Sequence, residues 1–485
     1  MFLIGAITAF AASAAGYIVN GTVVIPGASS YNGLNLVPQM GWDNWNAFGC
    51  SVDADLLTST ADSMTVNGLR DLGYKYVILD DCWSSGRNSS GYLEANPIKF
   101  PNGMAPVADH IHSLGMKFGI YSSAGQFTCG KYPGSLDYET YDAEYWASVG
   151  VDYLKYDNCY NLGRSGTPKI SFDRFNVMSQ ALNKTGRPIV YGMCNWGDDN
   201  PFDWAYGIAN SGRMSGDIYD SFNRPTGSCP CTSNPCDWPG FQCSIMNILG
   251  KMAPIFSRTQ PGYFNDMDML EVGNGGMTDD EYIIHMSMWA MMSSPLIMGT
   301  DIRSITPGNF SIYANPAVIA VNQDPSGGAA YRVYQNFCDD KDENGQCETD
   351  LFVRGLPSGD MIVAMINGAN SAMRMPITLQ DIFGYNQKTP ASRAAQSWDI
   401  YDLWGNRMSD AEAATVLNGT APLIGADSTS STRYNSTALP YAMGIGMNHT
   451  ALMGKKIGTF RPGQTRNPRL ARHSMIFWRL RPAAS

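Results

Sequence analysis

Short apolar runs alternate with helical patterns along the first two thirds of the chain. Val107, Ile111 and Leu114 recur at helical spacings of four and three residues and precede Gly115, a residue type that often ends helices. Eight apolar runs of strand length flank such patterns, over residues 37–42, 74–80, 116–122, 151–157, 189–195, 213–218, 263–270 and 295–300. Eight successive strand–helix units predict an α/β fold, a closed parallel (β/α)8 barrel of the TIM type.

An open, doubly wound sheet is the alternative arrangement for the same pattern. That fold commonly opens its first helix with Gly-x-Gly-x-x-Gly, and no such motif follows the first apolar run. The pattern therefore favours the barrel.

The hydrophobic pattern changes after about residue 325. Strand-like runs separated by turn residues replace the helical spacings, over 351–354, 361–367, 373–379, 398–404 and 475–480. We expect no helices between these runs. The chain is therefore predicted to consist of a barrel domain over 31–325 and an antiparallel β-sandwich domain over 326–485.

The first 15 residues form an apolar stretch that ends in small residues. Ala12-Ser13-Ala14 fits the cleavage site of a secretory signal, so residues 1–15 are predicted to be a signal peptide, and a buried helix is the alternative. Seven Asn-x-Ser/Thr sequons agree with secretion, at Asn20, Asn88, Asn183, Asn309, Asn418, Asn435 and Asn448. We predict a secreted, N-glycosylated protein without a membrane-spanning helix.

Composition and charge narrow the classes of partner. Of 485 residues, 44% are hydrophobic and 16% are charged, which is typical of a globular chain. The formal net charge is −10, and no basic block occurs. An acidic chain of this kind is not expected to bind nucleic acid or an anionic membrane surface, so we expect a small, neutral partner.

The eleven cysteines fit an oxidising compartment. Cys229, Cys231, Cys236 and Cys243 crowd into one loop, where either a zinc site or two disulfides would explain them. Disulfides are favoured because no His lies nearby, although spacing alone leaves their connectivity open. Cys338 and Cys347 bracket a turn and form a plausible local pair. The odd count leaves at least one thiol free.

Aspartates occur where the predicted barrel strands end. The relevant residues are Asp80, Asp81, Asp157, Asp217, Asp266 and Asp268. In a parallel barrel the reactive groups lie at the carboxyl ends of the strands, so these carboxylates should gather at one mouth. Tyr153, Lys155 and Asp157 alternate along one strand and share a face, so we expect the Lys155 ammonium to hold Asp157 ionised at neutral pH. A structural ion pair is the alternative.

Several clustered carboxylates and no metal-ligand cluster indicate glycoside hydrolysis, in which one carboxylate attacks the anomeric carbon and another donates a proton. The five histidines are scattered, and no dinucleotide or phosphate loop occurs, so we expect no metal and no organic cofactor. Aromatic residues near strand ends could stack on a sugar face or belong to the core: Trp45, Trp83, Tyr121 and Trp196.

Specific motifs extend this interpretation from about Gly33 to the C-terminus. They are Met40-Gly41-Trp42, Leu79-Asp80-Asp81-Cys82-Trp83, Gly119-Ile120-Tyr121, Tyr132-Pro133-Gly134-Ser135, Lys155-Tyr156-Asp157-Asn158-Cys159 and Asn265-Asp266-Met267-Asp268-Met269-Leu270. With these motifs the sequence resembles glycoside hydrolase family 27, the family of α-galactosidases. The cysteine-rich insertion and the closing Phe477-Trp478-Arg479-Leu480-Arg481-Pro482 are most similar to the secreted yeast and fungal members, the melibiases.

The resemblance implies a role for each matching residue. Asp157 matches the nucleophile and Asp217 the general acid/base. The expected substrate-binding residues are Trp45, Asp80, Asp81, Tyr121, Lys155, Cys194, Trp196, Arg213, Asp268 and Met269. Asp80, Asp81 and Lys155 would hold the galactose 3-, 4- and 6-hydroxyls, and the residues matching Cys194 and Trp196 contact the substituent on C2.

The resemblance also implies a disulfide pairing. The pairs are Cys50–Cys82, Cys129–Cys159, Cys229–Cys243, Cys231–Cys236 and Cys338–Cys347, which leave Cys194 free. Some positions depart from the family pattern: Asp43, Gly212, Tyr263, Phe264 and Met267. Because the matched carboxylates are intact, we expect these departures to affect the pocket shape more than the reaction.

The expected activity is that of a retaining exo-α-galactosidase acting on melibiose, raffinose and galactomannan side chains. An α-N-acetylgalactosaminidase or a β-L-arabinopyranosidase on the same fold is the first alternative. A catalytically silent sugar-binding protein is the second, but both predicted catalytic carboxylates are present. The sequence does not give the oligomeric state, and a homo-oligomer is one option because related fungal enzymes are often oligomers.

Overall fold

The structure is a computed structural model that describes residues 17–19, 22–24, 32–225, 229, 242–384, 391–422 and 450–484. The predicted signal peptide, the Cys231–Cys236 pair and the sequons at Asn20, Asn435 and Asn448 lie outside these residues. No helix in the described ranges is both long enough and apolar enough to cross a membrane.

Eight parallel strands form the first sheet. They are β3 (Met40–Asp43), β4 (Tyr76–Leu79), β7 (Lys117–Ser123), β8 (Tyr153–Asp157), β9 (Val190–Cys194), β10 (Ser211–Arg213), β11 (Phe264–Asp266) and β12 (Leu296–Met298). Their order is β11-β10-β9-β8-β7-β4-β3-β12, and a parallel bridge between Leu270 and Met298 joins the two ends. The sheet is thus closed, and the predicted barrel is confirmed.

One predicted barrel strand was misplaced. The sixth was expected over 213–218, but β10 ends at Arg213, and its register is set by Ser211, which pairs with Gly192 on one side and Phe264 on the other. Only Met214 separates Arg213 from the small residues Ser215 and Gly216, and the chain leaves the sheet at this point. Asp217 therefore lies in a loop, four residues beyond the strand.

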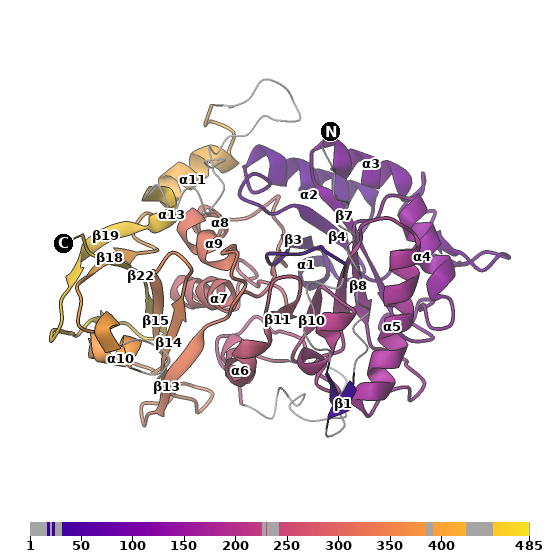
Figure 1. Cartoon of the computed structure of the whole chain (residues 1–485). Coiled ribbons are helices and arrows are strands. Elements are labelled where there is room, and N and C mark those ends of the chain that lie inside the picture. The colour runs from indigo at the N-terminus through magenta and orange to yellow at the C-terminus, as the bar shows by residue number, and fades with distance from the viewer. Residues whose placement is uncertain are drawn as a thin grey trace, which may run out of the picture.

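Helices cover the outside of the barrel (Figure 1). They are α2 (Ala54–Val66), α3 (Ala105–Ser113), α4 (Glu139–Ser148), α5 (Pro168–Lys184), α6 (Ile245–Met252), α7 (Asp279–Met291), α8 (Pro307–Tyr313) and α9 (Pro316–Asn322). The short helix α1 (Trp45–Phe48) instead follows β3 at the carboxyl end of the barrel. The stop expected after α3 is Gly115, whose φ of 73° is the left-handed conformation that glycine adopts without strain. Short 3-10 helices span Pro201–Asp203, Ala205–Gly207, Ala253–Arg258 and Ala391–Arg393.

Two hairpins stand outside both main sheets. β1 (Tyr17–Val19) pairs with β2 (Thr22–Val24), and β5 (Ser84–Arg87) pairs with β6 (Leu93–Ala95).

Alternation along the barrel strands decides which side chains reach the mouth. In β8, Leu154 and Tyr156 pack in the main core beneath the helices, whereas Tyr153 belongs to a small apolar cluster inside the barrel. Lys155 and Asp157 share the inward face with Tyr153, as predicted. The barrel interior thus carries apolar side chains lower down and polar groups at its carboxyl end.

The C-terminal part is a β-sandwich beside the barrel (Figure 1). Its main sheet contains β13 (Tyr331–Phe337), β14 (Glu348–Gly355), β15 (Met361–Asn367), β22 (Ser474–Pro482), β18 (Trp398–Asp402) and β19 (Lys455–Phe460), in that order. The second layer consists of the short pairs β16 (Met373–Arg374) with β21 (Arg469–Leu470) and β17 (Ile377–Thr378) with β20 (Thr465–Arg466). The predicted antiparallel sandwich is confirmed.

The main sheet buries both faces. In β15, Ile362, Ala364 and Ile366 belong to the core shared with the barrel, and the alternate residues Met361 and Val363 belong to the separate sandwich core. A strand that is buried on both sides has a continuous apolar sequence, which is why this run was recognisable.

The expectation that this domain lacks helices is wrong. The predicted strand over 373–379 is divided into β16 and β17 and continues into α10 (Leu379–Phe383), and α11 (Asp410–Leu417) and α13 (Thr450–Met453) follow. Ser409 and Glu412 form a capping box at the start of α11, a local signal that was present in the sequence.

Candidate active site

A cavity of about 240 Å³ lies at the carboxyl ends of the barrel strands. Both predicted catalytic aspartates and all ten predicted sugar-binding residues line it. The lining residues are Trp45, Asn46, Asp80, Asp81, Tyr121, Cys129, Lys155, Asp157, Cys194, Trp196, Arg213, Asp217, Ile218, Asp268 and Met269. The barrel thus brings together side chains that are far apart in sequence, as expected for the active-site end of such a fold.

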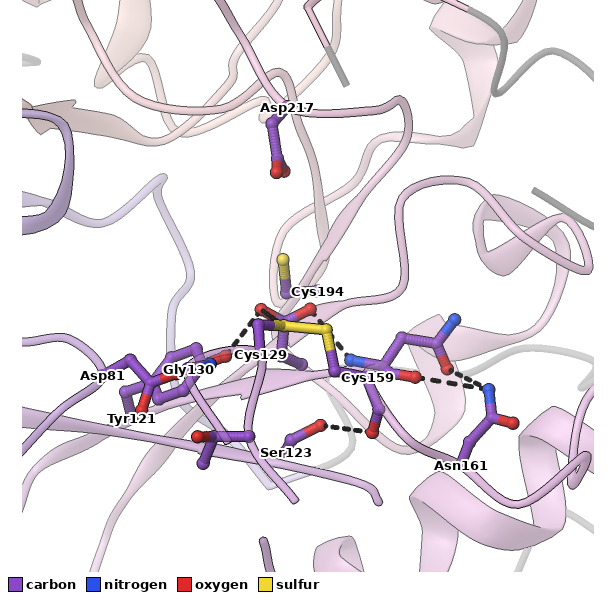
Figure 2. Close-up of a disulfide and its surroundings, with 12 residues drawn as sticks. Asp81, Tyr121, Ser123, Cys129, Gly130, Cys159, Asn161, Cys194 and Asp217 are labelled. Atoms are coloured by element: carbon purple, nitrogen blue, oxygen red, sulfur yellow. Dashed lines mark hydrogen bonds between the residues drawn. A yellow bond between two sulfur atoms is a disulfide. The ribbon is translucent and has the colours of Figure 1, made fainter. Parts of the chain in front are cut away.

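Asp157, the last residue of β8, is held by hydrogen bonds on both carboxylate oxygens. The Tyr121 hydroxyl donates to Oδ2 at 2.9 Å, and the backbone N–H of Asn158 donates to Oδ1 at 2.8 Å. Sγ of Cys129, which is disulfide-bonded to Cys159, lies 3.3 Å from Oδ2 (Figure 2). The carboxylate is 7% exposed and has a fixed orientation toward the cavity.

The charge state expected for Asp157 needs correction. Lys155 Nζ lies 2.6 Å from Asp80 Oδ2 and 3.9 Å from Asp43 Oδ2, so its ion pairs are with these residues and not with Asp157. Burial, together with the negative charge of Asp217, raises the pKa of Asp157 to about 7, and Lys155 opposes this rise only in part. Asp157 is therefore a buried carboxyl whose proton affinity is high, as at many catalytic centres.

Asp80 and Asp81 follow β4 and form another part of the cavity wall. Asp80 Oδ2 accepts a hydrogen bond from the Lys155 ammonium, and Asp81 Oδ2 accepts a 2.7 Å hydrogen bond from the backbone N–H of Gly130. Both aspartates are 2% exposed, and burial raises the pKa of Asp81. Two buried carboxylates and an ammonium at one wall offer several acceptors and donors to the hydroxyls of a small polar ligand.

Asp217 faces this group from the loop after β10. Arg213 Nη2 lies 2.9 Å from Asp217 Oδ1 and 2.6 Å from Asp268 Oδ2. The Asp217 side chain is 50% exposed, in contrast to the buried Asp157. Figure 2 shows its carboxylate pointing across the cavity toward Cys194 and the Cys129–Cys159 disulfide.

The environment of Asp217 favours its protonated form. Its pKa is raised, chiefly because the cavity desolvates the carboxyl, and Arg213 lowers it while Asp268 raises it. Asp268 also accepts a 2.8 Å hydrogen bond from the backbone N–H of Ile218, which fixes the loop that carries Asp217. A carboxyl with a raised pKa beside a second carboxyl is the arrangement that acid–base chemistry requires.

Strained backbone conformations occur at three of the strand ends that surround the cavity. Cys82, Trp196 and Asp268 have φ values of 72°, 58° and 78°, and each lies within three residues of the end of a barrel strand. Non-glycine residues seldom adopt this region, and such conformations are typical of functional sites. The strain turns the chain sharply, so that these three loops wrap the cavity.

One wall of the cavity consists of Cys194 and Trp196. Cys194 ends β9, is a free thiol 2% exposed, and its Sγ lies 3.5 Å from Arg213 Nη1. Burial raises the pKa of this thiol well above its usual value. Cys194 is therefore a small neutral wall residue rather than a thiolate nucleophile.

Trp83, the remaining aromatic candidate, does not line the cavity. Its Nε1 donates to the Tyr121 carbonyl at 2.9 Å, and its ring stacks on Tyr145 with centroids 6.3 Å apart. Trp83 is thus a core residue that supports the strand carrying Tyr121.

Two of the departures from the family pattern compensate each other. A Cβ at Gly212 would lie 2.6 Å from the Tyr263 hydroxyl, so the Tyr263 side chain occupies the space that a larger residue at 212 would need. The small residue beside Arg213 is therefore matched by a large one directly before the neighbouring strand β11.

The structure contains four of the disulfides that the resemblance implied, Cys50–Cys82, Cys129–Cys159, Cys229–Cys243 and Cys338–Cys347. Within the described residues, the one group with metal-like spacing is Cys129, Asp157 and Cys159. Because its two sulfurs are joined in a disulfide, the group offers no thiolate ligand.

Sequence reasoning missed three residues of the cavity wall: Asn46, Ile218 and, outside its disulfide role, Cys129. Asn46 follows Trp45 in the short helix α1, and Ile218 follows Asp217 in the loop after β10. Neither a single helical turn nor a loop shows a periodic pattern, so only their adjacency to those residues could have indicated them.

The fold and the site define a class of protein. A closed parallel barrel, with two carboxyls facing one cavity and further carboxylates beside a lysine at its wall, is the architecture of barrel glycoside hydrolases. Comparison with known proteins agrees. Residues 37–324 match the family model described as alpha galactosidase A, and residues 346–423 match the alpha galactosidase C-terminal beta sandwich domain.

Individual relatives give the same result. The chain is 50% identical to Alpha-galactosidase 6 of Saccharomyces cerevisiae over 94% of this chain and 96% of that protein. The solved α-galactosidase structure from Saccharomyces cerevisiae superposes with a TM-score of 0.89 at 49% identity, covering 94% of this chain and 100% of that one. The α-galactosidase I structure from Mortierella vinacea has a TM-score of 0.78 at 42% identity, with 94% and 99% covered. The chain belongs to the α-galactosidase (melibiase) family of glycoside hydrolases.

Proposed function

We propose that this protein is a retaining exo-α-galactosidase, with Asp157 as the nucleophile and Asp217 as the general acid/base. The observation that carries the proposal is the pairing of two unlike carboxyls across one cavity. Asp157 is buried and hydrogen-bonded on both oxygens, whereas Asp217 is half exposed on the opposite loop. A fixed, buried carboxylate suits attack on carbon, and an exposed one suits proton exchange with the leaving group and water.

The reaction proceeds in two displacements. Asp157 attacks the anomeric carbon while Asp217 gives its proton to the glycosidic oxygen, so that the bond to the leaving sugar breaks and a galactosyl ester forms on Asp157. Asp217, now ionised, then takes a proton from water, and the water oxygen attacks the same carbon and releases Asp157. Each step inverts the configuration, so the product keeps the α configuration.

The remaining wall residues orient the galactosyl unit. Asp80, Asp81 and Lys155 form a charged, buried wall that can hydrogen-bond to the ring hydroxyls. Arg213 and Asp268 contact the sugar and also hold the loop that carries Asp217. The other proposed sugar contacts are Trp45, Tyr121, Cys194, Trp196 and Met269. Because the cavity is closed at its barrel end, we expect only a terminal unit to fit.

The substrate class is that of α-galactosides such as melibiose, raffinose and the side chains of galactomannan. In one solved structure the Saccharomyces cerevisiae α-galactosidase, 48% identical to this chain, is combined with raffinose. The test is hydrolysis of p-nitrophenyl α-D-galactoside, compared with the α-N-acetylgalactosaminide and the β-L-arabinopyranoside. Hydrolysis of the α-galactoside alone supports the proposal. A dominant rate on either other glycoside, or none on all three, would overturn it.

Secretion, glycosylation and domain boundaries are also part of the proposal. The side chains of Asn88, Asn183 and Asn418 are exposed, whereas Asn309 is partly buried, so the first three sequons are the proposed glycan sites. The four disulfides suit an extracellular location. We keep the boundaries at 31–325 for the catalytic domain and 326–485 for the sandwich, and assembly into a homo-oligomer stays a prediction.

A further inference from the structure

Glu271 is a buried carboxyl directly behind the cavity wall, in the loop after β11. It is 4% exposed and accepts hydrogen bonds from Nδ2 of Asn46 and, at 2.5 Å, from Nδ2 of Asn274. The main groups that act on its charge are these amides and the carboxylates of Asp220 and Asp268, and no cation of the described ranges forms a salt bridge with it. A buried carboxyl without a cation is costly for stability, so its presence calls for a role.

Asn46 is the residue that connects Glu271 to the cavity. It lies in α1 beside Trp45, and both side chains line the cavity. Its Nδ2 donates a hydrogen bond to Glu271 Oε1, and no described residue donates a hydrogen bond to its Oδ1. A Cβ at Gly299 would lie 3.2 Å from Cβ of Asn46, so the wall behind Asn46 is closely packed. The Asn46 amide is thus fixed by Glu271 on the side away from the cavity, and its Oδ1 is available to accept a hydrogen bond from a ligand.

The position of Asn46 indicates which part of a substrate it meets. The residues at the floor of the cavity, such as Asp80 and Asp157, are 2–7% exposed. Asn46 lies three residues beyond the end of β3, as Asp217 lies four beyond β10, and both side chains are only partly buried. They therefore belong to the rim. The rim holds the leaving group, because Asp217 must reach the glycosidic oxygen there.

We propose that Asn46 accepts a hydrogen bond from a hydroxyl of the leaving sugar, and that Glu271 is the positioning residue that fixes the Asn46 amide for this contact. The inference rests on the proposed function and deepens it, because it makes the enzyme select for substrates whose leaving group is itself a sugar. An aryl leaving group carries no hydroxyl for Asn46.

The protonation of Glu271 fits this role. Burial, reinforced by Asp220 and Asp268, raises the pKa of Glu271 to about 8, and the Asn274 and Asn46 amides oppose the rise only in part. At acidic and neutral pH the side chain is therefore a neutral carboxylic acid, whose carbonyl oxygen accepts from Asn46 Nδ2. A glutamine keeps this acceptor in the same shape, and its N–H donors then face Asn274, whose amide must turn its oxygen toward them.

The experiment compares KM for melibiose and raffinose with KM for p-nitrophenyl α-D-galactoside in four variants. Asn46→Ala should raise KM for both sugars about three- to tenfold, the loss expected for one hydrogen bond. The aryl substrate should change by less than about twofold, since it makes no such contact. Glu271→Leu should reproduce this pattern, and Glu271→Gln should keep the KM of the unaltered protein.

Asn274→Ala is the matched control. The substitution also removes an amide that contacts Glu271, but Asn274 does not line the cavity. The ratio of KM for the sugars to KM for the aryl galactoside should therefore stay unchanged.

A purely structural role would give a different pattern. It would lower the melting temperature and change both substrate types equally, and that result would overturn the proposal. The same holds if Asn46→Ala leaves KM for melibiose unchanged, or if Glu271→Gln is as harmful as Glu271→Leu. If Glu271→Leu fails to fold, Asn46→Ala and Glu271→Gln alone decide. Failure of the proposed function is distinguishable, since the unaltered protein would then not hydrolyse the aryl galactoside at all.

Discussion

At the scale of single residues, the two carboxyls proposed to be catalytic differ in exposure and partners. Asp157 accepts hydrogen bonds from Tyr121 and Asn158, whereas Asp217 is paired with Arg213 in a half-exposed loop. The sequence placed both at strand ends, but it could not give their environments. The expectation that Lys155 pairs with Asp157 was wrong, because which of two neighbouring carboxylates an ammonium contacts depends on side-chain geometry across strands.

The first prediction separates the roles of Asp157 and Asp217. Asp217→Ala should lower the rate on melibiose by about 10²–10⁴-fold, the usual value of general acid catalysis, but should lower the rate of galactosylation by aryl galactosides with acidic phenols far less. Asp157→Ala should abolish both. Rapid-quench measurement of the released phenol tests this, and equal losses for both substrates in Asp217→Ala would remove Asp217 from the acid role.

The second prediction concerns the substituent on C2 of the sugar. The indole of Trp196 and the thiol of Cys194 should leave no room for an acetamido group, so kcat/KM for the p-nitrophenyl N-acetylgalactosaminide should be several orders of magnitude below that for the galactoside. Cys194→Ser with Trp196→Ala should narrow this gap. Comparable values in the unaltered chain would contradict the assignment, and an unchanged gap in the double variant would place the selectivity elsewhere.

At the scale of elements, the eight apolar runs predicted the barrel because buried parallel strands have continuous apolar sequences. The sandwich was less readable. β13 and β19 were missed because they are edge strands with partly exposed side chains, and α11 because only its capping box, Ser409 with Glu412, marks it. The four-residue helix that carries Asn46 and the loop that carries Glu271 show no periodic pattern, so their contact could be found only in the structure.

The third prediction concerns the disulfide that ties the loops after β7 and β8. Replacing Cys129 and Cys159 with Ser should lower the free energy of unfolding by about 2–4 kcal/mol and should also raise KM, because the disulfide lies against Asp157. The control is Cys338→Ser with Cys347→Ser, which opens a disulfide away from the cavity. It should lower stability without changing KM. An unchanged KM in the first variant would show that the loops hold their positions unaided.

At the scale of the whole molecule, the barrel and the sandwich share one core and a buried polar contact. His473 Nδ1 lies 2.6 Å from Glu281 Oε1 at the start of α7, and the His473 ring stacks on Phe222 with centroids 4.2 Å apart. Burial would raise the pKa of Glu281, but the bond to His473 and the backbone N–H of Thr278 outweigh it, so the pKa is lowered. The contact therefore links the two parts through an ionised carboxylate.

The fourth prediction follows from the sign of that shift. A lowered pKa means that Glu281 stabilises the fold above its unfolded pKa, near 4.5, and that this stabilisation is lost as pH falls through the folded value. Glu281→Gln should lower the free energy of unfolding at pH 6–7 by about 1–3 kcal/mol, and its difference from the unaltered protein should shrink as the pH falls below the unfolded pKa and through the folded one. Glu412→Gln is the control, because Glu412 holds the same capping position at the exposed start of α11. Calorimetry over this pH range should show a much smaller loss of stability for the control. Equal losses would show that the contact between His473 and Glu281 is not the source of the stabilisation.

The central claim is a double displacement on Asp157, and the anomer of the first product tests it most directly. In retaining enzymes the two carboxyls lie about 5–5.5 Å apart, too close to admit an attacking water between them, so galactose must be released with the configuration of the substrate. Proton NMR during the first minutes of hydrolysis, before mutarotation, should show α-galactose appearing first and β-galactose growing in later. Initial appearance of β-galactose would mean direct attack by water and would contradict the double displacement.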